Sequence, residues 1–130
     1  MMQSWISIRK DILAFQAKVG RPIMFTEVGW PNQATCGQYP WDYYRSPDQP
    51  APRAQANCFE AFFRTWNDQP NVIGILVWEW RNRPDMVTSP TKDTSYVPCD
   101  KPAMEVIKRY FKPPRPTSAP ATAPATAPAK

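Results

Sequence analysis

Residues 22–30 form the stretch Pro22-Ile-Met-Phe-Thr-Glu-Val-Gly-Trp30, from which the fold class can be inferred. Apolar residues occupy both of its alternating sets of positions. This pattern is expected for a strand of a parallel sheet that is covered on one face and packed into a core on the other. A second stretch of the same kind, VIGILVWEW, extends from Val72 to Trp80. The sequence therefore predicts two buried strands.

Helical periodicity surrounds the two strands. Ser4 is a suitable N-cap for a first helix that ends before Gly20, and a second and a third helix are predicted at Arg53–Asp68 and Pro102–Phe111. Apolar residues recur at three- and four-residue spacing in the first helix, at Trp5, Ile8, Ile12, Phe15 and Val19. The order helix, strand, helix, strand, helix predicts an α/β fold with right-handed βαβ connections in a parallel sheet. Two strands alone cannot complete such a sheet.

Two segments lack this periodicity. Pro31 to Pro52 is dense in Pro, Gly, Asn, Asp and Tyr, which predicts a long loop of the kind that is usually functional. Residues 113–130, PPRPTSAPATAPATAPAK, hold six of the 17 prolines and no aromatic residue. This segment cannot bury a core and is expected to be an extended tail, so the folded domain is expected to comprise residues 1–112.

Composition excludes several functional classes. The 130 residues contain no histidine, which excludes Ser-His-Asp and Cys-His catalysis and most zinc sites within this chain. No metal or cofactor is expected. The net charge is +5, but the basic residues are scattered, so no nucleic-acid partner is expected. No apolar run approaches membrane-spanning length, and no export signal is visible at the N-terminus. The chain as given is therefore expected to be cytoplasmic, with no membrane contact.

The three cysteines give no recognisable framework. Cys36, Cys58 and Cys99 are odd in number, are widely spaced and form no C-x-x-C motif. Neither a zinc ribbon nor a closed set of disulfides is indicated. One disulfide is expected only if the parent protein is exported.

Glu27 is the first candidate for chemistry. In parallel α/β barrels the active site lies at the C-terminal ends of the strands, and Glu27 occupies such an end. A period of two places it on one face with Ile23 and Phe25. Apolar neighbours would partly desolvate this carboxylate, as suits a nucleophile or a general acid/base. The alternative is a structural salt bridge with an arginine.

Trp78 and Trp80 are candidates for sugar binding. Indole faces stack on the C–H faces of sugar rings, and the indole N–H can reach a hydroxyl. Core packing is the alternative. Along the second strand the two tryptophans share one parity with Gly74 and Leu76, whereas the opposite, helix-facing parity holds Ile73, Ile75, Val77 and Glu79. Glu79 is therefore expected to pair with a nearby arginine.

The stretch RPIMFTEVGWPN resembles the seventh strand of clan A glycoside hydrolases, in which a glutamate at the strand end is the catalytic nucleophile. It is joined in order by YPWDYY, the helix from Gln55 to Trp66, GILVWEW, DTSYVP and KPAMEVI. This series resembles glycoside hydrolase family 113, the β-mannanase-like TIM barrels, from about Trp5 to Phe111.

The resemblance implies that the chain is the C-terminal portion of a (β/α)8 TIM barrel, from about helix six to helix eight. It implies that Glu27 is the nucleophile and that Trp80, with Trp78 beside it, forms a wall of the sugar-binding site. Trp30 and the loop from Trp41 to Tyr44 are expected to add further sugar contacts. In the family the acid/base glutamate comes from the fourth strand, which would precede residue 1. The missing N-terminal half of the barrel is therefore a candidate partner.

Three functions follow as hypotheses. The first is a C-terminal fragment of a retaining glycoside hydrolase that acts on a β-linked polysaccharide such as mannan, through Glu27. The Met1-Met2 start would then mark a truncated gene, a split reading frame or an internal start. The second is a carbohydrate-binding or interaction module without catalysis, and the third is a nonfunctional remnant. The Pro/Ala/Thr-rich tail would suit a secreted or surface-attached parent, but cytoplasmic linkers commonly have the same composition.

Overall fold

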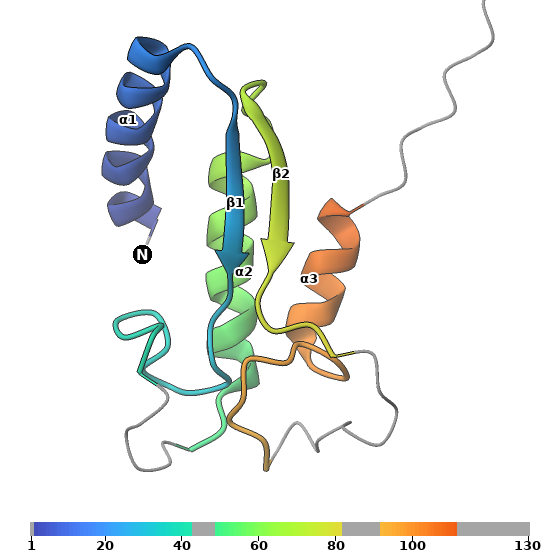
Figure 1. Cartoon of the computed structure of the whole chain (residues 1–130). Helices are drawn as coiled ribbons and strands as arrows, with labels where there is room; N and C mark the ends of the chain where they lie inside the picture. Colours follow the sequence, from blue (N-terminus) through green and yellow to red (C-terminus); the bar gives the residue numbers. More distant parts are fainter. Residues whose placement is uncertain (1, 43–48, 82–91, 112–130) are drawn as a thin grey trace, which may run out of the picture.

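The computed structural model describes residues 2–42, 49–81 and 92–111 and forms a βαβ unit flanked by two further helices (Figure 1). The two strands pair in parallel. All five predicted elements are present in the predicted order: α1 (Met2–Val19), β1 (Ile23–Val28), α2 (Pro52–Trp66), β2 (Val72–Val77) and α3 (Pro102–Tyr110). Both strands are shorter than predicted, because each ends before its last tryptophan. The predicted tail lies outside the described residues.

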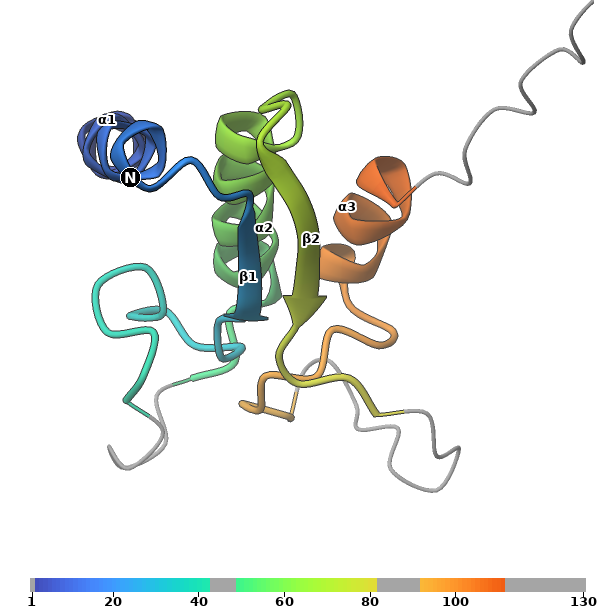
Figure 2. The ribbon, with the colours of Figure 1, turned by 45° about the horizontal axis from the view of Figure 1, so that its top comes forward.

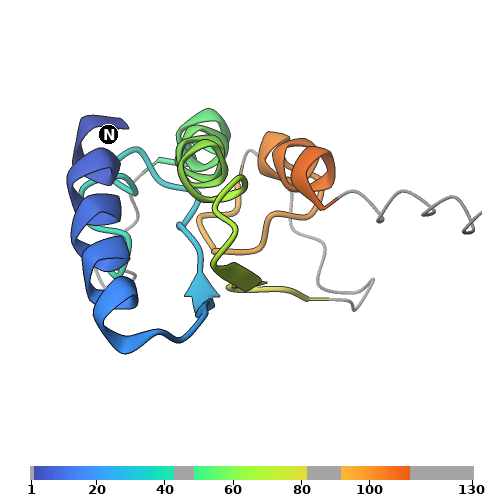
Figure 3. The same ribbon diagram turned by 90° about the horizontal axis from the view of Figure 1, so that it is seen from above.

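The helices cover one side of the two-stranded sheet. Seen from above, α2 and α3 lie on the same side of β1 and β2, and α1 lies beside β1 (Figure 3). No described element covers the opposite face of the sheet. Met24 and Leu76 on that face are 50% and 51% exposed. The sheet therefore presents an apolar face that nothing in the described part of the chain buries.

Aromatic rings on α2 form the centre of the core. The ring of Phe62, which is 1% exposed, lies 5.5 Å from that of Trp5 on α1 and 5.1 Å from that of Phe25 on β1. Trp66, one turn further along, contacts the same two rings. Edge-to-face aromatic pairs of this kind stabilise a fold beyond the area that they bury. Helix α2 therefore connects α1 to the sheet.

Helix α1 buries a narrower face than its apolar spacing predicts. Trp5 and Ile12 pack against the core. Ile8, Phe15 and Val19 are instead 44%, 66% and 49% exposed. Only part of the apolar surface of α1 therefore lies against the core.

Glu60 links α2 to α3. Its carboxylate accepts hydrogen bonds from Arg64 at 2.6 Å, from Arg109 at 2.6 Å and from Tyr110 at 3.2 Å. Partial burial raises the pKa of Glu60, but the hydrogen bonds from Arg64 and Tyr110 outweigh this effect. The positive charge of Arg109 acts in the same direction, so the pKa of Glu60 lies below its usual value. The carboxylate is therefore stabilised in its charged form by Arg64 on α2 and by Arg109 and Tyr110 on α3.

No helix in the described ranges is both long enough and apolar enough to cross a membrane.

Candidate functional site

A bulge near the end of β1 sets the direction of Glu27. Phe25 is paired with Ile75, but the next pair is Val28 with Val77, so β1 holds one more residue than β2 over this interval. Phe25 faces the helices and contacts Phe62 and Trp66. Glu27 is exposed. The prediction that Phe25 and Glu27 share a face is therefore wrong, because the extra residue reverses the alternation between them.

The chain after β1 passes very close to the chain after β2. The amide of Trp78 donates a hydrogen bond of 2.8 Å to the carbonyl oxygen of Val28. Gly29 follows, and a Cβ atom on it would collide with the carbonyl oxygen of Trp78. Only a residue without a side chain permits this approach. Gly29 therefore brings Trp78 beside Glu27.

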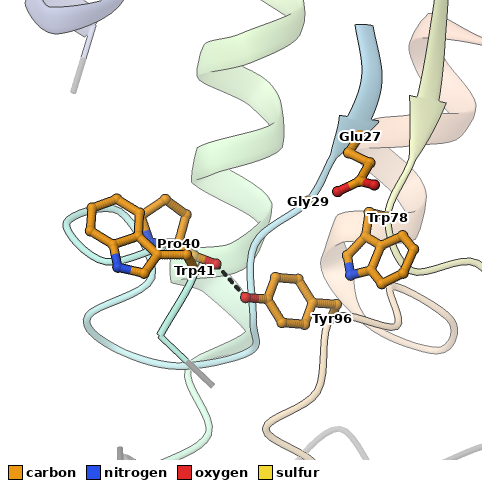
Figure 4. Close-up of a pocket in the computed structure, with 6 residues that line it drawn as sticks. All are labelled: Glu27, Gly29, Pro40, Trp41, Trp78 and Tyr96. Atoms are coloured by element: carbon orange, nitrogen blue, oxygen red, sulfur yellow. Dashed lines mark hydrogen bonds between the residues drawn. The ribbon is translucent and has the colours of Figure 1, made fainter. Parts of the chain in front are cut away.

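Glu27 and Trp78 line one pocket of about 350 Å³ at the C-terminal end of the sheet (Figure 4). Its other lining residues are Gly29, Pro40, Trp41 and Tyr96. Glu27 is the one carboxylate among the described residues that line it. The carboxylate is more exposed than the sequence predicts, because the face of the sheet opposite the helices is uncovered.

A loop forms the wall of the pocket across from Trp78. The side chain of Trp41 is 69% exposed, and its ring lies 6.2 Å from that of Tyr39. The hydroxyl of Tyr96 donates a hydrogen bond to the carbonyl oxygen of Pro40 (Figure 4). Tyr96 thus joins the loop that follows β1 to the loop that precedes α3.

Buried polar groups hold the Tyr96 loop in place. The amide nitrogen of the Gln55 side chain donates to the carbonyl oxygens of Trp30 at 2.9 Å and Tyr96 at 3.1 Å. Lys101 is 2% exposed and donates from Nζ to Val97 O at 2.6 Å and to the carboxylate of Asp93. A buried ammonium requires such partners. These contacts fix the loop on the first turn of α2 and the start of α3.

Two residues predicted to contact sugar, Trp30 and Trp80, do not line the pocket of Glu27. Trp30 is 7% exposed, and its ring packs against Phe59 at 5.1 Å, so it belongs to the core. Trp80 is 52% exposed but lines a different, apolar groove with Met104 on α3. The expectation that Trp78 and Trp80 point the same way is wrong, because β2 ends at Val77 and the strand alternation ends with it. A sugar contact by Trp30 is not supported by its burial.

The remaining side-chain expectations for β2 are mostly met. Ile75 and Val77 pack against the core, whereas Ile73 is 67% exposed. The carboxylate of Glu79 accepts two hydrogen bonds from Arg81, at 2.7 and 3.0 Å. The predicted pairing of Glu79 with an arginine is confirmed. This carboxylate lies outside the pocket of Glu27.

Tyr96 lies in the DTSYVP motif, but no pattern in the sequence predicts that it lines the pocket. Loop residues have no periodicity that would indicate where their side chains point. The one sequence feature that could have indicated this position is a tyrosine followed by Val-Pro, in the connection between the second strand and the third helix.

The described ranges contain no group of three or more Asp, Glu, Cys or His side chains that could hold a metal ion.

Comparison with known proteins agrees with this geometry. The family model described as Glycoside Hydrolase Family 113 matches residues 1–101. The β-mannanase AaManA of that family from Alicyclobacillus acidocaldarius, solved in complex with ManMIm, is similar with 31% identity and a TM-score of 0.73. That match covers 85% of this chain and 35% of the mannanase.

Two further solved structures show the same fold. Both are described as family 113 β-1,4-mannanases, with 23% and 24% identity and TM-scores of 0.70 and 0.69. Each match covers 84% of this chain and 35% of the other. No curated protein sequence matches the chain significantly. The chain thus spans about a third of the length of the structures that it matches.

Proposed function

This chain belongs to glycoside hydrolase family 113, and from that membership we propose that it forms part of a retaining glycosidase in which Glu27 is the nucleophile. It would supply the portion of a TIM barrel from about helix six to helix eight. The observation that carries the proposal is the position of Glu27, at the C-terminal end of a parallel strand and in one pocket with an exposed indole. The substrate class is a β-linked polysaccharide such as mannan.

In the first step a carboxylate oxygen of Glu27 attacks the anomeric carbon of a bound sugar. The bond from that carbon to the glycosidic oxygen breaks, and a second carboxyl group protonates the departing oxygen. In the second step a water molecule attacks the anomeric carbon of the glycosyl ester, gives its proton to the second carboxylate and releases Glu27. The bulge in β1 supports this role, because it turns Glu27 away from the helices and into the pocket.

Aromatic side chains on both sides of Glu27 suit a sugar ring. Trp78 is 48% exposed and Trp41 is 69% exposed, so both indoles have accessible surface. The hydroxyl of Tyr96 holds the backbone beside Trp41. A pocket of about 350 Å³ lies at the lower end of the usual range for ligand sites. These features support stacking of a sugar on Trp78, with Trp41 as a second wall.

The acid/base carboxylate belongs, in this proposal, to a part of the barrel outside these 130 residues. A retaining mechanism requires the two carboxyl groups about 5 to 5.5 Å apart. Among the described residues Glu27 has no carboxylate beside it in the pocket. Glu79 is not a suitable substitute, because both of its oxygens bind Arg81. The 35% coverage of the mannanase leaves ample chain to supply this group.

The test is kinetic and uses an enzyme with the complete barrel. Glu27→Ala is expected to lower kcat on mannan by about a thousandfold or more, because the glycosyl ester cannot form. Binding of a mannan oligosaccharide should change little, since the aromatic walls remain. Glu79→Gln is the matched control and should retain most activity.

Unchanged turnover in Glu27→Ala would refute the assignment of the nucleophile. Tight sugar binding without turnover in the unmodified complete protein would instead favour a carbohydrate-binding module. The two exposed indoles of the pocket would serve that function without Glu27.

A further inference from the structure

Two of the three cysteines meet inside the molecule. Cys36 lies in the loop that follows β1, and Cys58 lies on α2. Their sulfur atoms are 3.6 Å apart, and both side chains are fully buried. Cys99 is separate from this pair and contacts the carbonyl oxygen of Arg81. We propose that Cys36 and Cys58 form a disulfide bond that fastens the pocket loop to α2.

The distance between the sulfurs favours this pairing over the two that involve Cys99. A disulfide requires a sulfur–sulfur separation of about 2.0 Å, which two thiols already in contact reach by small side-chain rotations. The backbone around Cys36 is held by a hydrogen bond of 3.2 Å from its amide to the carbonyl oxygen of Gln33. The two residues are therefore positioned for the bond before it forms.

Burial determines when the bond forms. The hydrogen bond with Cys36, and then burial, raise the pKa of the Cys58 thiol well above its usual value. The thiolate is the form that attacks a disulfide, so the folded dithiol reacts slowly. The bond therefore forms while the chain is folding or locally open, and once formed it is shielded from reductants.

The oxidant is a small-molecule disulfide such as oxidised glutathione. The thiolate of one cysteine attacks a sulfur of that disulfide and releases one glutathione thiolate. The thiolate of the other cysteine then attacks the protein sulfur of the mixed disulfide, which forms the Cys36–Cys58 bond and releases the second glutathione. The two thiol protons end on the two glutathione molecules.

The bond would act on the pocket through the chain that it closes. Pro40 and Trp41, two of the residues that line the pocket of Glu27, lie between Cys36 and Cys58. A disulfide between these cysteines, which are 22 positions apart in the sequence, closes a loop and so removes conformational freedom from the unfolded chain. The oxidised protein therefore keeps the Trp41 wall in place at higher temperature than the reduced protein.

The full chain is refolded in a mixture of reduced and oxidised glutathione, its remaining thiols are alkylated, and its peptides are mapped by mass spectrometry. We expect one cross-linked pair containing Cys36 and Cys58, with Cys99 alkylated. Three alkylated cysteines, or a cross-link that includes Cys99, would overturn the proposal.

Two variants separate pairing from folding. Cys99→Ser should keep the cross-link, whereas Cys58→Ser should abolish it and leave Cys36 alkylated. In the Cys99→Ser background of an enzyme with the complete barrel, the oxidised protein should melt about 5 °C above the protein reduced with dithiothreitol. Equal melting temperatures, or a cross-link that persists in Cys58→Ser, would contradict the inference.

Discussion

Gly29 lies directly against the carbonyl group of Trp78, and this contact joins the ends of the two parallel strands. The hydrogen bond from Trp78 to Val28 belongs to the same junction. Seen from an angle that brings the top of the molecule forward, the two strands end side by side, with the loops of the pocket below them (Figure 2). The pocket thus depends on a backbone contact as well as on Glu27 and the indole.

Replacement of Gly29 by alanine tests this contact. Its Cβ would collide with a backbone atom, which cannot move aside as a flexible side chain can. We expect Gly29→Ala to lower kcat/KM of an enzyme with the complete barrel at least about tenfold, because Trp78 must shift. Gly74→Ala is the control, since its Cβ would lie 3.5 Å from the Met24 side chain, an ordinary contact. Equal activity of the two variants would show that the close approach is unimportant.

Replacement of Trp78 tests the proposed sugar platform. Trp78→Ala should raise KM for mannan oligosaccharides about five- to tenfold, because the ring that stacks on the sugar is lost. Trp80→Ala removes an indole of similar exposure, 52% against 48%, that lies in the groove beside α3. It should leave KM nearly unchanged. If Trp80→Ala had the larger effect, the sugar would not lie in the Glu27 pocket.

The sequence predicted the elements well, and the directions of side chains less well. Strand and helix periodicity identified five elements, and Ile75 and Val77 face the helices as expected. The bulge before Glu27 could not be predicted, because an extra residue leaves no mark on composition. Past Val77 the alternation of the strand no longer applies, so Trp78 and Trp80 line different pockets. Tyr96 lines the pocket, and Lys101 holds the loop that carries Tyr96. The geometry of such loops depends on tertiary packing, so it could not be predicted.

The Glu60 network predicts a specific loss of stability in acid. Its pKa is lower in the folded protein than in the unfolded chain. The contribution of Glu60 to the free energy of unfolding is therefore fully present at a pH above 4.5, the ordinary pKa of glutamate. It is lost as the pH falls through the lower pKa that Glu60 has in the folded protein. In urea titrations of a complete enzyme at several pH values, Glu60→Gln should be less stable than the parent at pH 7 and should converge with it in acid.

Glu105→Gln is the matched control for this prediction. Glu105 pairs with Lys108 on the surface of α3, where both side chains are mostly exposed. Exposed pairs contribute little to stability. If Glu105→Gln reproduced the pH dependence of Glu60→Gln, the effect would not come from the contact between α2 and α3.

The uncovered face of the sheet predicts the behaviour of the isolated 130-residue chain. Met24 and Leu76 would be exposed beside unpaired strand edges, which favours association. We expect no appreciable hydrolysis of mannan, and elution from a sizing column as oligomers. The double variant Met24→Lys and Leu76→Lys should elute closer to the monomer. A monomeric, cooperatively melting parent chain with turnover would contradict this expectation.

Trapping the covalent intermediate tests directly whether Glu27 is the nucleophile. A complete enzyme is incubated with a 2-fluoro mannosyl donor carrying a good leaving group, which slows hydrolysis of a glycosyl ester more than its formation. Mass spectrometry of the digested protein then locates the sugar. We expect one sugar on the peptide that contains Glu27, and no label in Glu27→Ala. A label on a different carboxylate would contradict this assignment.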